Sequence, residues 1–342
     1  MTTQQVIPAP NQSASGSEIT YRDAIRDAMF EEMARDPNVF LIGEDLRDPW
    51  GGAYKTTVNV SNVYGNDRVI NTPIAEESII GAALGAALTG LRPVAELQYL
   101  DFVMRAMDAV VNQVAKVRYM SGGQVQVPLV IRAQGGGGRS SAAQHGNSLE
   151  AWLCHVPGLF IAHPSTPYDA KGLLKTAIRL NDPVFFIEHK MLYMTKGFVP
   201  DTDYTIPFGV ADIKRRGTDV TIVANSRMVL FALEAAELLA AEGISVEVID
   251  PRTLVPLDEA TILESVRKTN RLVVVNEGVE RCGWAAEVAA MVQKRAFSDL
   301  DAPIERVCSR NVPLPFQPEM ESYVLPSVPD IISAVKIALY VS

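Results

Sequence analysis

The feature that most constrains this chain is a regular alternation of short, apolar runs with longer amphipathic stretches. The short runs are rich in Val, Ile and Phe, as in VFFI at residues 184–187 and VVV at residues 273–275. Strands that are apolar on both faces and separated by helices are typical of parallel sheets that helices cover on both sides. The alternation therefore predicts the α/β class, with doubly wound, mainly parallel sheets.

The same pattern places the elements along the chain. Strands are expected at residues 39–43, 94–98, 129–133, 159–162, 184–188, 220–224, 245–249, 272–276 and 304–308. Helices are expected at residues 24–36, 76–88, 102–120, 148–154, 168–180, 228–242, 258–269, 285–296 and 330–340. Ligands bind beyond the carboxyl ends of strands in open α/β sheets, so the loops after these strands are the places to search for a site.

The length of 342 residues suits two domains of roughly 150 residues each. Residues 1–18 are rich in Gln, Ser, Asn and Pro, which bury too little surface to offset the entropy of ordering, so we expect a loose tail there. Residues 194–209 carry two prolines and two glycines and mark a break. The expected division is a first doubly wound domain at 19–195, a linker at 196–208 and a second at 209–342.

Charge and cysteine content exclude several classes of partner. The chain has 31 basic and 40 acidic residues, a net charge of −9, and a surface that follows phosphates needs the opposite sign, so we expect no nucleic acid. No apolar run approaches the ~20 residues of a membrane span, so we expect no membrane. Three widely spaced cysteines fit neither a disulfide framework nor a zinc site, and no secretory signal is recognisable. We therefore expect a cytoplasmic protein with no metal site of its own.

Familiar phosphate-binding motifs are missing. No G-x-G-x-x-G opens a helix after the first strand, and GGGGRSS at 135–141 lacks the lysine of a Walker A loop. A G-D-G segment with a downstream Asn, which holds Mg²⁺ on a diphosphate, does not occur either. We therefore expect that this chain alone holds neither a nucleotide nor a diphosphate.

The segment TPIAEESIIGAALGAALTG at 72–90 is a candidate site. Thr72 is the expected N-cap and Pro73 a first-turn residue, so Glu76 and Glu77 fall early in a helix. In the structural interpretation, the helix dipole alone explains carboxylates at this position. In the functional interpretation, one of these carboxylates shares a proton with a ring nitrogen of a bound molecule. Both interpretations stay open. The rest of the helix is almost all Gly, Ala, Leu and Ile, which predicts a fully buried helix that another helix can approach closely.

The four histidines give one further candidate. His145 lies in a loop at the carboxyl end of a strand, where a functional and a structural role are equally plausible. His155 lies in WLCHVPG and favours a packing role, whereas His163 and His189 follow strands and could face the same cleft.

Two aromatic residues follow the strand at 94–98. Tyr99 and Phe102 are more often core residues, although a planar cofactor would need such an apolar face.

Taken together, these segments resemble the β subunit of the two-chain, thiamine-diphosphate-dependent 2-oxoacid dehydrogenases, the E1 component, a transketolase-like family. The resemblance runs from about residue 20 to the end of the chain. The motifs occur in the expected order as GED with GGAYK, TPIAE, GLRPVAE, RYMSGG, AAQH, HVPGL, PSTPYDAKGLL, VIDPRTLVPLD, NEG with AEVAA, and RVCSRNVPLP. Any one of these matches would be weak, and their order makes them specific.

The resemblance implies a cofactor bound between two subunits. The α chain would hold the diphosphate and Mg²⁺, and this chain would cover the aminopyrimidine. Glu76 would hydrogen-bond the pyrimidine ring nitrogen and so promote formation of the carbanion, with Glu77 secondary. Phe102 would pack on the pyrimidine and Gln98 would line the pocket. His145 would handle the substrate and acyl transfer to the lipoyl group, and the turn at residues 120–123 resembles part of a structural K⁺ site.

The implied function is oxidative decarboxylation of a small 2-oxoacid, with acyl transfer to a lipoyl acyltransferase (E2). The working unit would be an α₂β₂ heterotetramer, in which the Gly/Ala helix offers a flat face for the contact. Two alternatives stay open: a relative that cleaves acetoin or forms carbon–carbon bonds through the same carbanion, and a non-catalytic scaffold paralogue. Gly146, where the family usually has Ser, and Asn311, where Asp is common, are the departures that leave the substrate open.

Overall fold

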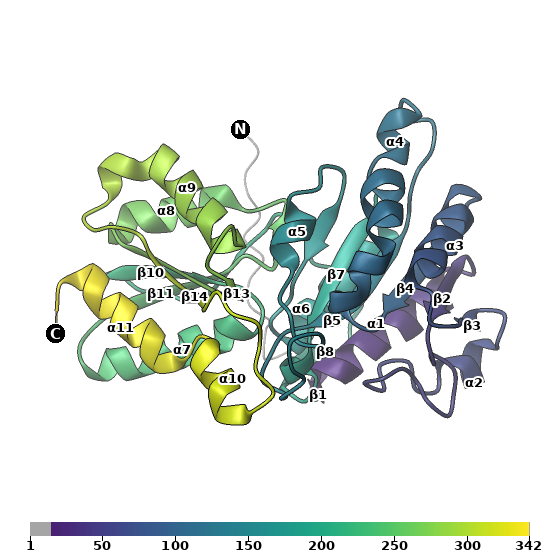
Figure 1. Cartoon of the computed structure of the whole chain (residues 1–342), viewed down its shortest axis with the longest axis horizontal. Helices are drawn as coiled ribbons and strands as arrows, with labels where there is room; N and C mark the ends of the chain where they lie inside the picture. Colours follow the sequence, from purple (N-terminus) through teal and green to yellow (C-terminus); the bar gives the residue numbers. More distant parts are fainter. Residues whose placement is uncertain (1–14, 342) are drawn as a thin grey trace.

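Two α/β units lie side by side in the computed structural model, which describes residues 15–341 (Figure 1). Most of the expected tail lies outside the described residues. Its last part does not fit the expectation, because β1 (Gly16–Thr20) pairs antiparallel with β8 (Lys196–Pro200). The expected linker therefore also begins inside a strand. This small sheet ties the start of the first unit to the segment that leaves it.

The first unit is built on a seven-stranded sheet with the order β12-β6-β7-β5-β4-β2-β3. Its strands are parallel except β12, which pairs antiparallel with β6 at the edge. Because β12 comes from the second half of the chain, the two units share this sheet. The bounds are β2 Val39–Gly43, β3 Val69–Asn71, β4 Arg92–Leu97, β5 Val130–Gly135, β6 Phe160–Ala162, β7 Val184–His189 and β12 Thr253–Val255.

Both faces of this sheet are buried, as the apolar runs predict. Along β2, Phe40 and Ile42 point into one core, and Val39 and Leu41 point into the other. Helices α1 and α6 cover one face, and α3 with the following helical turns covers the other. The bounds are α1 Tyr21–Arg35, α2 Val60–Tyr64, α3 Glu76–Leu88, η1 Leu100–Ala106, η2 Ala109–Val114, α4 Val117–Met120, α5 Glu150–Cys154, α6 Pro167–Arg179 and η3 Lys190–Leu192.

The second unit has a five-stranded sheet with the order β14-β13-β10-β11-β9, in which only β9 is antiparallel. Helices α7 and α11 pack on one face, and α8 and α9 pack on the other. The core under α9 continues into the first unit, so the two sheets share buried residues. The bounds are β9 Asp212–Arg215, β10 Val220–Ala224, α7 Arg227–Ala241, β11 Val246–Asp250, α8 Glu259–Thr269, β13 Leu272–Val279, α9 Trp284–Ala296, η4 Phe297–Asp299, β14 Glu305–Ser309, α10 Pro318–Val324 and α11 Val328–Leu339. The fold class is thus confirmed, with antiparallel edge strands added.

The stretch Pro318–Leu339 is long and apolar enough to cross a membrane by length and composition alone. In the structure it forms two helices, because the chain leaves helical geometry after Val324 and restarts at Val328. Ser327 and Asp330 form a capping box at the second start, which satisfies free backbone groups there. Helix α11 then packs on α7 and on the second sheet.

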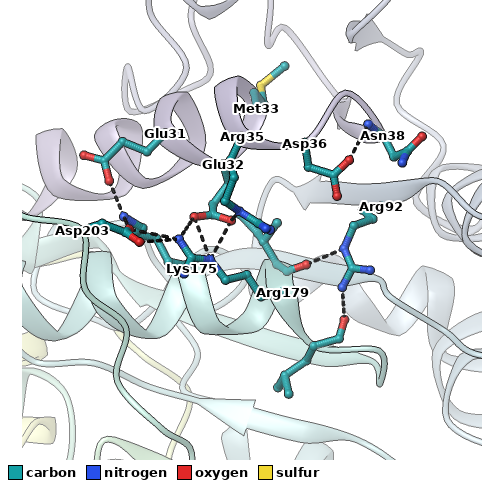
Figure 2. A network of polar contacts seen from close by, with 12 residues as sticks. Glu31, Glu32, Met33, Arg35, Asp36, Asn38, Arg92, Lys175, Arg179 and Asp203 are labelled. Carbon is teal, nitrogen blue, oxygen red and sulfur yellow. Dashed lines mark hydrogen bonds and ion pairs between the residues drawn. The ribbon is translucent and has the colours of Figure 1, made fainter.

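A polar network joins α1 to α6 on the first unit (Figure 2). The fully buried carboxylate of Glu32 accepts hydrogen bonds from Arg35 and from both ends of the Arg179 guanidinium. Lys175 pairs with Glu31 and Asp203. Buried charges require such partners, so the network fixes how α1 lies across α6.

Three local predictions were wrong. The helix expected at 102–120 is a series of 3₁₀, π and α segments, because Val103, Val110 and Val114 are buried on the sheet and packing overrides one regular helix. Thr72 is not the N-cap of α3, since its N–H bonds the carbonyl of Gly43 and Ala75 occupies the cap position. Helix α3 is also not fully buried.

One face of α3 is exposed in the isolated chain. Gly81 and Gly85 lie on this face, and a Cβ added at either glycine would meet nothing within 4 Å. The opposite face, with Ile79 and Ile80, is buried in the core. The small residues are therefore available to another surface, as the Gly/Ala pattern predicts.

Candidate active site

Two carboxylates meet at the carboxyl end of the first sheet. Glu44 directly follows β2, and Glu76 lies in the first turn of α3, which follows the neighbouring strand β3. Their residues are 8% and 7% exposed. Burial, together with the negative charge of Glu76, raises the pKa of Glu44 to about 7. Glu44 can therefore hold a proton near neutral pH.

These carboxylates lack protein donors. Within residues 15–341, no side chain or backbone group donates a hydrogen bond to the Glu76 carboxylate, and Glu44 Oε1 is buried without a partner. Buried carboxylate oxygens are normally hydrogen-bonded. The site is thus chemically incomplete and suits a nitrogen donor from a bound molecule.

Gln98 forms part of the surface beside this pair. Its Nε2 donates to the backbone carbonyl of Glu44 at 2.9 Å and lies 3.4 Å from Glu96 Oε1. Arg132 then pairs with Glu96 at 2.9 Å and with Glu188 at 2.6 Å, and all three side chains are at most 1% exposed. The buried ion triad therefore fixes Glu96, one of the two residues that Gln98 contacts.

An aromatic wall stands next to Gln98. The ring centroids of Phe102 and His145 are 5.3 Å apart in an edge-to-face arrangement, and those of Tyr99 and His145 are 5.8 Å apart. Lys190 Nζ lies 4.7 Å from the Tyr99 ring centroid and donates to the backbone carbonyl of His145. Burial lowers the pKa of Lys190 to about 8. His145 therefore stands beside an apolar face with a cation close by.

The structure brings some of the predicted residues together and places other predicted residues apart from them. The contacts above join Gln98 to Glu44, and they join Phe102 to His145. Glu77 is exposed on α3, although it adjoins Glu76 in sequence. The packing role expected for His155 is wrong, since it ends the short helix α5 at the surface and is exposed.

The remaining two histidines are buried. Burial lowers the pKa of His163 to about 3. His189 Nε2 lies 2.9 Å from a carboxylate oxygen of Glu277, in the second unit. Neither histidine contacts the Glu44–Glu76 pair, and both lie in the region where the two units meet.

Sequence reasoning missed Glu44 and Lys190. Both directly follow or end a buried strand, which is the position the strand-end rule points to. Without the strand order, however, nothing placed Glu44 next to Glu76 rather than beside another loop. Within the described residues, no three His, Cys, Asp or Glu side chains gather as a metal site.

The two departures from the family pattern have different surroundings. A Cβ at Gly146 would lie 3.0 Å from Cδ1 of Leu314, so an apolar side chain of the second unit covers this position. Asn311 is exposed, and its Oδ1 accepts a hydrogen bond from the N–H of Arg281 at 3.2 Å. A carboxylate at 311 could accept the same bond, so this departure keeps the local contact.

The comparisons with known proteins agree with the two-domain fold. Residues 17–196 match the transketolase pyrimidine-binding domain, and residues 209–331 match the transketolase C-terminal domain. A solved structure described as a split-gene transketolase, an inactive β4 tetramer, is similar with a TM-score of 0.78 at 25% identity, covering 94% of this chain and 99% of its own. Fold and site thus define a transketolase-like protein with a pyrimidine-binding and a C-terminal domain.

Named relatives narrow the class. The chain is 48% identical to the β subunit of acetoin:2,6-dichlorophenolindophenol oxidoreductase from Cupriavidus necator, over 93% of this chain and 97% of the relative. It is 49% identical to the β subunit of the pyruvate dehydrogenase E1 component from Rickettsia felis, over 95% of this chain and 99% of the relative. The chain belongs to the family of 2-oxoacid dehydrogenase E1 β subunits, which depends on thiamine diphosphate.

The residues on this chain fit the pyrimidine half of that cofactor. Within the described residues, Glu44 Oε1 is buried without a donor and no protein group donates to the Glu76 carboxylate, and a protonated ring nitrogen or an exocyclic amino group can supply the missing hydrogen bond. The half-buried ring of Phe102 offers an apolar face to a planar group.

Proposed function

We propose that this chain supplies the activating half of a shared active site in an α₂β₂ E1 enzyme that decarboxylates a small 2-oxoacid and transfers the acyl group to a lipoyl acyltransferase. The observation that carries the proposal is the pair of buried residues Glu44 and Glu76: within the described residues, Glu44 Oε1 is buried without a hydrogen-bond partner, and no protein group donates to the Glu76 carboxylate. The exposed Gly81–Gly85 face of the helix that carries Glu76 supports a partner subunit next to this pair.

Each site residue has a distinct proposed role. Glu76 would hydrogen-bond the pyrimidine ring nitrogen, Phe102 would pack on the ring, and Gln98 would line the pocket. When bound, thiamine diphosphate supplies the carbon nucleophile that 2-oxoacid decarboxylation requires. The α subunit would hold the diphosphate and Mg²⁺. A structural K⁺ at the turn of residues 120–123, where Gly122 and Gly123 have left-handed backbone conformations, is a further part of the proposal.

Proton handling follows from burial. Glu76 would accept a hydrogen bond from the ring nitrogen of the bound cofactor, and Glu44, with its pKa raised to about 7 by burial and by Glu76, is the neighbouring group that can take up or give a proton. His145, with its backbone carbonyl bound by Lys190 and its ring against Phe102, would orient the substrate and the incoming lipoyl group.

The identity of the substrate needs a direct test. The relative named for acetoin does not favour acetoin cleavage over 2-oxoacid decarboxylation, because the relative named for pyruvate is equally similar. The chain is purified with its α subunit and assayed for reductive acylation of a lipoyl domain with pyruvate, with a branched-chain 2-oxoacid and with acetoin. Activity with a 2-oxoacid supports the proposal, whereas activity with acetoin alone would contradict it.

A further inference from the structure

The loop that carries His145 lies against the second unit. It connects β5 to α5 and begins with a run of glycines. A Cβ at Gly137 would lie 2.9 Å from Cδ1 of Leu325, and a Cβ at Gly138 would lie 2.6 Å from Nη1 of Arg227. The glycines therefore let the loop backbone approach side chains of the C-terminal domain more closely than any other residue would allow.

Two carboxylates of the C-terminal domain accept hydrogen bonds from the loop where it approaches this domain. Glu277, at the end of β13, is 6% exposed, and its Oε1 accepts hydrogen bonds from the N–H of Gly137 at 2.8 Å and from the hydroxyl of Ser148 at 3.0 Å. Its Oε2 lies 2.9 Å from Nε2 of His189. One carboxylate thus binds both ends of the loop and the N-terminal domain.

Glu321 binds the middle of the same segment. It lies on α10 and is 3% exposed, and its two oxygens accept from the N–H groups of Gly138 and Ser140, at 2.9 and 2.8 Å. Ser140 has a φ of 54° and Ala142 has a φ of 61°, and residues other than glycine rarely adopt such positive values. A backbone in this conformation needs surrounding contacts to hold it.

The N-terminal domain holds the part of the loop nearest His145. Asp101 Oδ1 accepts from the backbone N–H and the side-chain amide of Asn147, at 3.1 and 2.5 Å. Lys190 donates to the carbonyl of His145. The loop is thus held by contacts from both domains, and the His145 ring lies against Phe102 of the N-terminal domain.

We propose that Glu277 and Glu321 are positioning residues of the C-terminal domain, which hold the loop of residues 136–148 so that His145 stays in the substrate site. This inference rests on the role proposed above for His145. Hydrogen bonds from backbone N–H groups to buried carboxylates are charge-assisted and stronger than neutral ones. Burial raises the pKa of Glu277, but His189 and Arg227 outweigh this effect and lower it to about 2, so the carboxylate stays charged.

The test uses the full chain purified with its α subunit. In Glu321→Gln, one oxygen of the acceptor pair becomes an amide donor that faces a backbone N–H, so one of the two bonds is lost. Ser148→Ala is a milder second variant that removes one bond to Glu277 and leaves its charge. Glu247→Gln is the matched control, because Glu247 is a buried carboxylate of the same domain whose hydrogen-bond partners are Gly217, Ser265 and Lys268.

Three readouts are compared in each variant. Hydrogen exchange of the 136–148 amides measures the order of the loop without any reaction. Lipoyl acylation measures kcat and KM, and thiamine diphosphate affinity measures the cofactor half of the site. In Glu321→Gln we expect faster exchange confined to the loop, and kcat for acylation lowered by about tenfold to 100-fold with KM and cofactor affinity nearly unchanged. Ser148→Ala should change loop exchange and the kcat for acylation in the same directions by less.

Three outcomes would overturn the proposal. The first is loop exchange in Glu321→Gln and Ser148→Ala equal to that of the parent protein. The second is equal change in the Glu247→Gln control, which would indicate general loss of stability. The third is faster loop exchange with unchanged acylation while His145→Ala abolishes acylation. If His145→Ala itself leaves acylation unchanged, the role proposed for His145 is wrong. The positioning role is then wrong as well, even if the exchange data show that Glu277 and Glu321 order the loop.

Discussion

Glu44 and Glu76 stand together at the carboxyl ends of two adjacent parallel strands, both buried, and the charge of Glu76 helps to raise the pKa of Glu44 to about 7. Desolvated carboxylates that repel each other are a common means of holding a proton where chemistry needs one. Without a bound donor the pair is also a local source of instability, since burial disfavours the charged form. We therefore expect this pair of carboxylates to affect the stability of the chain as well as its activity.

Glu44 should make the isolated chain less stable as the pH rises. Burial and Glu76 raise its pKa from 4.5 to about 7, so the folded state binds more protons than the unfolded state between these values. The free energy of unfolding contributed by Glu44 is then fully present below pH 4.5 and is lost as the pH approaches 7. Urea unfolding of the parent chain and of Glu44→Gln at pH 5 and pH 7.5 should show a smaller pH dependence in the variant. An identical dependence in both would contradict this prediction.

Arg132 should be essential for the stability of the first domain. Replacing it with Met leaves Glu96 and Glu188 buried without a cation, and removing one partner of a buried pair costs about 3–5 kcal/mol. Denaturant unfolding measures the loss, with Arg281→Met, an exposed arginine, as the control that should stay within about 0.5 kcal/mol. A loss below about 1 kcal/mol would mean that the triad is not held as charged groups.

His145 should matter more for acyl transfer than for cofactor binding. In His145→Ala the ring that contacts Phe102 and Tyr99 is lost, whereas Glu76 and Gln98 keep their surroundings. We expect lipoyl acylation to fall by about 100-fold or more and the affinity for thiamine diphosphate to stay nearly unchanged. His155→Ala, at an exposed position, is the control and should change neither. Equal loss of acylation and of cofactor affinity would refute the assignment.

Restoring the usual serine at Gly146 should disturb the contact between domains. The added Cβ would lie 3.0 Å from Leu314 Cδ1, so Leu314 must move. We expect Gly146→Ser to cost about 1 kcal/mol of stability, because overpacking a filled site is destabilising. Adding Leu314→Val should recover most of the loss in thermal unfolding. Destabilisation that Leu314→Val leaves unchanged would show that the contact is not the cause.

Much of the fold could be predicted from the sequence because long apolar strands and amphipathic helices carry strong periodic signals. The strand 39–43 and the helix 76–88 were placed within their observed bounds. Short edge strands such as β12 were missed, because their pairing depends on contacts with the other half of the chain. The irregular stretch after Tyr99 was predicted as one helix, since local pattern does not reveal how Val110 and Val114 meet the sheet.

The candidate site was predictable residue by residue but not as an arrangement. The motifs identified Glu76, Gln98, Phe102 and His145, and the structure adds how Gln98 adjoins Glu44 and how Phe102 meets His145. Glu44 lies beside Glu76 because β2 and β3 are neighbours in the sheet, and the sequence pattern does not reveal this strand order. Glu277 and Glu321 accept hydrogen bonds from residues of the His145 loop that lie more than 120 positions away in the sequence. No local sequence pattern reveals such contacts.

Glu76→Gln, in the enzyme assembled with its α subunit, tests the central claim most directly. Artificial-acceptor turnover of a 2-oxoacid is measured beside Glu77→Gln, a matched change at the exposed neighbouring carboxylate. We predict that Glu76→Gln lowers turnover by about 100-fold or more, because the amide cannot exchange a proton with the ring nitrogen, and that Glu77→Gln stays near the parent rate. Parent-like turnover in Glu76→Gln would show that this carboxylate does not activate the cofactor, and the proposed function of the chain would then be wrong.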